Sequence, residues 1–280
     1  MLARKKMPVQ GWSAYGGKTK IIAGLLALSF CLPVFAASQN VSGVLEGKKK
    51  KYSVPLNEST YQTLFNLPNY TCSQYGYTDA TLGACHNFLN YDRADQKEAL
   101  LPLVNWIKKK IKKPDDQARV AASLVQKMEY DYEKYQNNGE SNGRGHDPRY
   151  PYEVLYENKG ICGEKASLIV YLLKQLGYGT ATITFFSPLH EVAGVKCADP
   201  YDFQNTGYCF IDPNYRHMIT FAGSYDDDTP DQIIPISDGK TFGAKKDYKD
   251  SQSWWKVLLE GTRSNKNYKL YKKLVKKYGL

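Results

Sequence analysis

Apolar residues recur at every third or fourth position in three stretches of the chain, and this spacing predicts three helices. The first helix is expected within residues 98–111, and Pro114 should stop it. The second opens at Asp115, whose negative charge suits a helix N-terminus, and runs toward Tyr135. The third begins near Cys162. Its wide apolar face comprises Ala166, Ile169, Val170, Leu172, Leu173 and Leu176.

Beyond Gly177 the pattern changes from helical spacing to runs of β-branched and aromatic residues, which are typical of strands. The predicted strands are residues 180–186, 191–196 and 208–211, with a weaker fourth run at 218–222. Helices that come first, followed by strands joined through short turns, favour an α+β fold with helices packed on an antiparallel sheet.

The segments on either side of this core are less regular. We divide the chain into five parts: a signal peptide (1–36), a basic linker (37–51), a loop-rich N-terminal lobe (52–114), the α+β core (115–224), and an acidic loop with a basic C-terminal helix (225–280).

The N-terminus has the features of an export signal. Basic residues from Arg4 to Lys20 precede or open an uncharged apolar run over residues 21–36, and small residues allow cleavage after Ala36 or Ala37. A retained membrane anchor is the alternative, although a spanning helix needs about 20 apolar residues. We therefore expect a secreted or periplasmic protein, which is membrane-anchored only if this segment is retained.

Export changes the interpretation of the cysteines, because disulfides persist in oxidising compartments. Without the cysteine of the signal segment, the mature chain keeps five cysteines, and this odd number leaves one thiol unpaired. Short-range pairing favours Cys72 with Cys85 and Cys197 with Cys209, and each loop would stabilise the fold by about 3 kcal/mol. Cys162 is then the free thiol, although sequence spacing alone leaves other pairings open.

The net charge of +10 is concentrated at the two ends of the chain. Residues 48–51 are all lysine, and residues 251–280 carry eight basic residues against one acidic residue, whereas residues 52–250 hold more acids than bases. A nucleic-acid partner is not expected, because such proteins carry a basic face on the core domain. The basic ends suit adhesion to an anionic membrane or envelope polymer. Solvated ends that keep the protein soluble are the alternative.

Cys162 lies at the predicted start of an apolar helix, between Gly160 and Gly163. Unpaired backbone N–H groups and the positive end of the helix dipole favour a thiolate at such a position. The same N–H groups stabilise an oxyanion once the sulfur has attacked a carbonyl carbon. A buried structural cysteine is the alternative interpretation.

A thiol nucleophile needs a base, and His190 is the best placed of the four histidines. His190 lies at the turn before one predicted strand and Asp212 lies at the end of the next, so the two side chains can meet on neighbouring strands. A carboxylate there holds the imidazole in one tautomer and stabilises the imidazolium. Each residue alone is more typical of a turn or a cap, but the order Cys, His, Asp indicates a catalytic triad.

The stretch from about residue 115 to residue 215 resembles the transglutaminase-like superfamily, the papain-fold group that includes transglutaminases and bacterial thiol peptidases. The matching segments are residues 160–166, 172–178, 190–192 and 207–214. The resemblance implies a papain-like catalytic core over residues 115–224. It also implies that Cys162 is the nucleophile, His190 the general base and then acid, and Asp212 the residue that orients His190.

Two features depart from the family pattern. Val192 replaces the aromatic residue usual after the histidine motif, and the segment between His190 and Asp212 is longer than usual. The excess predicts a disulfide-tied loop, from Cys197 to Cys209, beside the cleft. Three tyrosines are candidates for a further oxyanion donor, although each is more typical of a packing residue: Tyr130, Tyr132 and Tyr152.

The reaction expected of such a triad is acyl transfer through a thioester. Water as the acceptor gives a peptidase or amidase that acts on protein or peptide substrates, which we favour. An amine acceptor gives a cross-linking transglutaminase, and a non-catalytic scaffold that binds peptide or envelope polymer is the alternative from another class. No cofactor or metal is expected, and the acidic run at residues 226–228 is more typical of a solvated loop than of a calcium site.

Overall fold

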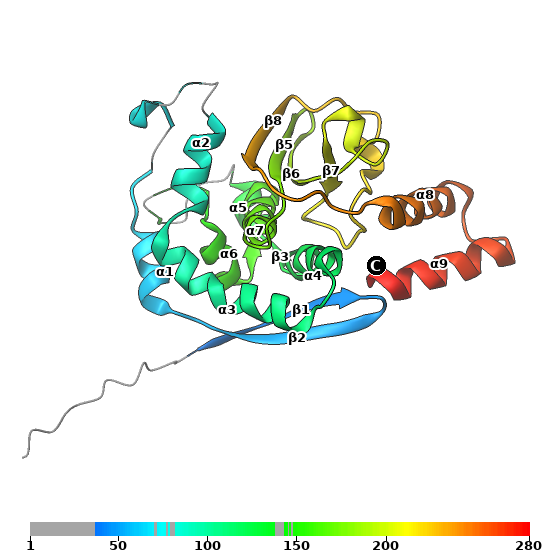
Figure 1. Ribbon diagram of the computed structural model, residues 1–280, viewed down its shortest axis with the longest axis horizontal. Helices are drawn as coiled ribbons and strands as arrows, with labels where there is room; N and C mark the ends of the chain where they lie inside the picture. Colours follow the sequence, from blue (N-terminus) through cyan, green and yellow to red (C-terminus); the bar gives the residue numbers. More distant parts are fainter. Residues whose placement is uncertain are drawn as a thin grey trace, which may run out of the picture. The chain divides into compact units, whose positions relative to one another are not determined.

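Helix α7 (Cys162–Gln175) lies between a layer of helices and a four-stranded sheet (Figure 1). The computed structural model describes residues 37–69, 72–76, 78, 82–137, 143–144, 146 and 148–280. Helix α7 packs against strands β5 (Thr180–Phe186) and β6 (Leu189–Lys196), and helices α4 (Pro114–Gln126) and α6 (Pro151–Glu157) pack against α7 in turn. Helices covering an antiparallel sheet confirm the α+β class.

The sheet has the strand order β7-β6-β5-β8 and is antiparallel throughout, with β7 at Tyr208–Ile211 and β8 at Gln232–Ser237. Three strands therefore lie where the sequence predicts them. Residues 218–222 are not a strand, because their apolar side chains fill the core without joining the ladder. The fourth strand is β8, inside the segment predicted to be an acidic loop. It holds Pro235 at the edge of the sheet, where a missing N–H is tolerated.

Burial explains why α7 forms where it does. Leu168, Ile169, Leu172 and Leu173 have no exposed surface, and each such side chain stabilises the fold by roughly 1.5–3 kcal/mol relative to leaving it in water. Gly177 follows the helix with a φ of +86°, the left-handed conformation that glycine adopts without steric cost.

The two earlier helices differ from prediction mainly at their ends. The first is α3 (Ala94–Lys110), which begins four residues before the predicted start. The second is α4, which ends at Gln126 and does not reach Tyr135, because a short strand β3 (Glu129–Tyr130) and helix α5 (Tyr132–Gln136) follow it. Strand β3 pairs in parallel with β4 (Lys159–Gly160), and this bridge directs the chain into α7.

The prediction of a basic linker at residues 37–51 is wrong, because these residues form most of a β-hairpin. Strands β1 (Ser38–Leu45) and β2 (Lys48–Pro55) pair with each other, and Val41 and Val54 are buried beneath them. The lysine run obscured the strand pattern: its backbone pairs with β1 while its side chains extend largely into solvent. Lysines on an exposed strand also discourage pairing with a further chain.

Residues 52–114 contain more helix than the loop-rich lobe that was predicted. Besides α3, the short elements are α1 (Glu58–Phe65), η1 (Cys72–Tyr75), α2 (Leu82–His86) and η3 (Asn87–Tyr91). The predicted signal peptide lies outside the described residues. In the part of the chain that the structure describes, no helix is both long and apolar enough to cross a membrane.

The C-terminal segment forms two helices and not one: α8 (Lys245–Glu260) and α9 (Asn265–Tyr278). The short turns η4 (Phe203–Asn205) and η5 (Gly223–Tyr225) lie between β6 and β8 along the chain. Asp247 of α8 is fully buried and binds Arg119 of α4, with an Oδ2–Nη2 distance of 2.6 Å. The C-terminal helices are thus attached to the core.

Candidate active site

Cys162 is the first residue of α7, and among the described residues it is the free cysteine. The β3–β4 bridge and a 3.2 Å hydrogen bond from the Asp131 N–H to the Gly160 carbonyl fix the chain immediately before it. Its side chain is partly exposed and lines a cavity, so the thiol is accessible. The structure therefore places Cys162 at a helix N-terminus, as the sequence predicts.

A buried ion network holds the start of α7. Glu164, the third residue of the helix, has no exposed side-chain surface and accepts a hydrogen bond from the Ile161 N–H at 3.0 Å. Its carboxylate also pairs with Lys134 Nζ at 2.7 Å and with Arg149 Nη1 at 2.9 Å. Burial raises the pKa of Glu164, but Arg149 and Lys134 outweigh burial and hold that pKa below its usual value. The sequence reasoning missed this network, although a glutamate three residues after a helix cap is a recognisable signal.

His190 is the second residue of β6 and is 6% exposed. The ring of Tyr225 stacks on the imidazole, with 4.9 Å between centroids and 23° between the ring planes. Tyr225 in turn contacts Phe185 and Phe210, which pack with Phe203 in a separate aromatic cluster on the sheet. This packing restricts the orientation of the His190 imidazole. The sequence reasoning did not identify Tyr225.

Asp212 follows the last residue of β7, and the antiparallel register of β6 and β7 brings it to the His190 end of β6. The Asn214 N–H donates to Oδ1 at 2.8 Å, and Gln126 Nε2 donates to the Asp212 backbone carbonyl at 2.9 Å. The other carboxylate oxygen, Oδ2, lies 3.5 Å from His190 Nε2. Hydrogen bonds therefore hold Oδ1 and the backbone carbonyl of Asp212, and Oδ2 faces the His190 imidazole.

The contact between His190 and Asp212 is an ion pair without the alignment of a hydrogen bond, and Nε2 has no other partner. Burial lowers the pKa of His190, but the interactions with Asp212 and then with Cys162 outweigh burial and raise the pKa to about 9. His190 is thus an imidazolium at neutral pH. Such a group can stabilise a thiolate on one side and protonate a leaving group near it.

Lys165 is a second residue that the sequence reasoning missed. It is fully buried one turn after Cys162, and its Nζ donates to the Met128 carbonyl at 3.1 Å. Burial lowers the pKa of Lys165 to about 8, although Asp212 and Cys162 oppose that shift. A buried cation beside these two residues adds to the positive potential at the start of α7. Its signal in the sequence was a lysine within the apolar helical pattern.

Of the three tyrosines considered as oxyanion donors, Tyr130 interacts electrostatically with the Cys162 thiol. Burial, and then the charge of Cys162, raise the pKa of Tyr130. Tyr132 is 66% exposed. Tyr152 is fully buried, and its hydroxyl bonds to the backbone of Asn57, so it serves packing.

His86 and His146 line the same cavity as Cys162, and His146 bonds to the carbonyls of Leu64 and Pro148. Burial lowers the pKa of His217. Over the described ranges, no group of three or more histidine, cysteine or acidic residues is arranged to hold a metal ion.

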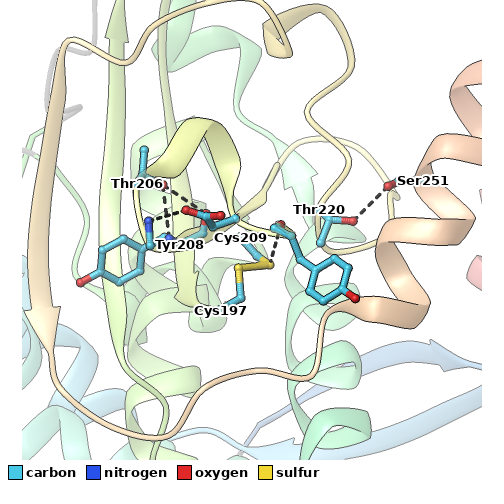
Figure 2. Close-up of a disulfide and its surroundings, with 9 residues drawn as sticks. Cys197, Thr206, Tyr208, Cys209, Thr220 and Ser251 are labelled. Carbon is cyan, nitrogen blue, oxygen red and sulfur yellow. Dashed lines mark hydrogen bonds between the residues drawn. A yellow bond between two sulfur atoms is a disulfide. The ribbon is translucent and has the colours of Figure 1, made fainter. Parts of the chain in front are cut away.

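Both predicted disulfides are present, Cys72–Cys85 and Cys197–Cys209. Figure 2 shows the second, in which Cys209 Sγ also lies 3.3 Å from the Tyr201 carbonyl oxygen. Cys197 directly follows the last residue of β6, whereas His190 is near its first residue.

The disulfide itself lies at the opposite end of β6 from His190, seven positions along the extended strand, which corresponds to about 23 Å. No residue of the loop lines the cavity at Cys162. The loop reaches the site indirectly, through Phe203, which packs on Phe185 and Phe210 beneath Tyr225.

A cavity with a volume of about 480 Å³ begins at Cys162 and His190 and extends along α7. Its walls are α7, the facing side of β5 and β6, and the segment from α2 to η3. Its polar lining residues include Tyr91, Ser167, Thr184 and Glu191. This volume lies within the range of pockets that bind small ligands or side chains.

No protein-family model matches this chain, and no curated protein sequence is significantly similar to it.

Proposed function

We propose that this chain is a transglutaminase-like cysteine hydrolase, a peptidase or amidase with a papain-like core. One observation carries the proposal: a free thiol at a helix N-terminus faces a buried imidazolium that a carboxylate holds from its other side. The resemblance over residues 115–215 supports the same assignment. Cys162 is the proposed nucleophile, His190 the acid and base, and Asp212 the orienting residue.

The mechanism follows from this arrangement. Because Nε2 of His190 faces Asp212, Nδ1 is left for the thiol. The Cys162 thiolate adds to an amide carbonyl carbon and forms a C–S bond, and backbone N–H groups at the start of α7 stabilise the oxyanion. The imidazolium gives its proton to the leaving nitrogen as the C–N bond breaks, which leaves a thioester. His190 then removes a proton from water, and the hydroxide releases a carboxylic acid and the thiolate.

An amine in place of that water would make the protein a cross-linking transglutaminase, and a protein with no turnover would be a binding scaffold. Hydrolysis is favoured because no observed feature excludes water from the partly exposed thiol.

The test uses residues 37–280 purified with their disulfides intact. The protein is incubated with a mixed peptide library, with and without a fluorescent primary amine, and products are identified by mass spectrometry. New carboxyl termini that the Cys162→Ala variant does not produce support the hydrolase, and amine incorporation supports the transglutaminase. A wild-type protein that releases no more product than Cys162→Ala would leave only the scaffold.

We also propose that the protein is exported and rests on an anionic membrane or envelope polymer. Two disulfides suit an oxidising compartment. The two basic segments come together in space, since the Gly47 N–H donates to the Lys277 carbonyl at 2.9 Å. Burial, and then the positive charges of Arg216 and Lys49, lower the pKa of Lys127, so positive charge accumulates near this hairpin.

A further inference from the structure

The cavity beside Cys162 contains a carboxyl group that no lysine or arginine of the described residues pairs with. Glu191 of β6 lies directly opposite Thr184 of β5, and residues paired in this way point to the same face of a sheet. Thr184 Oγ1 donates to Glu191 Oε2 at 3.4 Å, and within the described part of the chain the Glu191 side chain has no ion-pair partner.

The other acidic residue of the cavity wall is paired. Glu164 also lines the cavity, but Lys134 and Arg149 bind that carboxylate. Glu191 has no comparable partner, because no lysine or arginine is among the described lining residues and His190 alone acts on it as a cation.

Glu191 also lies next to the nucleophile. A Cβ atom at Gly163 would lie 3.2 Å from Glu191 Oε1, so the carboxylate touches the backbone that follows Cys162. The other lining residues include apolar side chains, such as Ile234, and hydroxyl groups, such as that of Tyr91. Apolar walls together with a carboxyl group and hydroxyl acceptors match an alkyl chain that ends in an ammonium group, which is a donor only.

We propose that this cavity binds an alkylammonium group of the substrate, with Glu191 as its counter-ion. The inference rests on the proposed function, because it assigns a substrate class to the same site. Burial raises the pKa of Glu191, while Thr184 and His190 oppose that shift, and a bound cation would lower the pKa and favour the carboxylate. A lysine-like side chain next to the scissile carbonyl, or a free amine acceptor, could supply the group.

The first experiment needs no turnover. Three methanethiosulfonates transfer an alkylthio group to the Cys162 thiolate, which forms a mixed disulfide and releases methanesulfinate. The reagents carry a 2-aminoethyl, a methyl or a 2-sulfonatoethyl group, and hence a positive, neutral or negative charge. Rates are compared with those of a small-molecule thiol, and Cys162→Ala serves as the blank.

The wild-type protein is expected to prefer the cationic over the neutral reagent by about tenfold more than the small thiol does, and to disfavour the anionic reagent. Glu191→Gln should remove most of that preference, whereas Glu98→Gln, an exposed acid on α3, should retain it. A wild-type ratio equal to that of the small thiol overturns the proposal without any variant. A ratio that Glu191→Gln leaves unchanged, with circular dichroism confirming the fold, overturns it too.

The second experiment identifies the source of the ammonium group. Peptide amides with lysine or norleucine at the acyl position are compared for kcat/KM, and added primary amines are tested for incorporation. A preference for lysine assigns the cavity to the acyl substrate, and saturable amine incorporation assigns it to the acceptor. If no amide is turned over while the reagent preference persists, the proposed function fails and the cavity assignment stands. If amides are hydrolysed without any charge preference, the cavity assignment fails and the proposed function stands.

Discussion

At the scale of single residues, the chemistry depends on how Asp212 and Cys162 act on one imidazole. Cys162→Ala and His190→Ala are expected to lower kcat/KM on an amide substrate by at least about a thousandfold, because the attacking atom or its proton donor is lost. Asp212→Asn should cost less, because it misorients the base without removing it. Thermal unfolding checks that each variant is folded. Wild-type turnover by Cys162→Ala would contradict the mechanism.

The pKa of His190 predicts the alkaline limb of the pH profile. The imidazolium must be present to protonate the leaving nitrogen, so kcat/KM should fall as pH rises through about 9. Asp212 raises that pKa, and Asp212→Asn should therefore move the falling limb toward lower pH, in the direction of the unperturbed value of about 6.5. The pKa of His190 also affects the stability of the fold. The charged His190 contributes its full stabilisation below a pH of about 6.5, and this contribution is lost as the pH rises through about 9. If the fall of kcat/KM occurs at the same pH in Asp212→Asn, a group other than His190 causes it.

At the scale of elements, the position of the nucleophile depends on what holds the first turn of α7. Glu164→Gln is expected to lower the free energy of unfolding by about 3–5 kcal/mol, because Lys134 and Arg149 lose their common partner in a buried site. Urea unfolding measures this loss. The matched control is Glu129→Gln, an exposed residue of β3, which should change it by less than about 0.5 kcal/mol. A Glu164→Gln variant as stable as that control would contradict the role of the network.

The elements that the sequence predicts well are those rich in apolar residues. Helix α7 and strand β5 are buried at most of their positions, and both lie where they were expected. Strands β2 and β8 were missed because a lysine run and Pro235 hide the pattern, and their pairing with β1 and β5 is a feature of the tertiary fold. In the same way, Cys162, His190 and Asp212 belong to local motifs, whereas Tyr225 reaches His190 only through the tertiary fold.

At the scale of the whole molecule, one disulfide joins η1 to α2 and the other joins the end of β6 to β7. Non-reducing peptide mapping of the mature protein should show Cys72–Cys85 and Cys197–Cys209, with Cys162 alkylated. Replacing Cys72 and Cys85 by serine should cost about 3 kcal/mol of unfolding free energy, since 13 residues separate them. A map with Cys162 in a stable disulfide would contradict both the pairing and the catalytic assignment.

The basic surface is the feature that only the assembled molecule reveals. Strand β2 begins with four lysines, and α9 carries six lysines and no acid, yet about 210 residues lie between them in the chain. The hydrogen bond from Gly47 to Lys277 and the approach of Gly279 to Val44 bring the two segments together. Their lysines can therefore act on one anionic surface at once, and each contributes roughly 1 kcal/mol when it lies near that surface.

The protein is therefore expected to bind vesicles that contain anionic lipid, and to release them when salt shortens the Debye length from about 10 Å at 0.1 M to about 3 Å at 1 M. Replacing Lys48, Lys49 and Lys51 by glutamine should weaken binding by at least about tenfold. Glutamine at three scattered exposed lysines makes the same change in net charge and should weaken binding much less: Lys97, Lys196 and Lys240. Vesicle sedimentation measures both variants. Equal losses in the two would mean that net charge alone drives adhesion, and the paired segments would then have no special role.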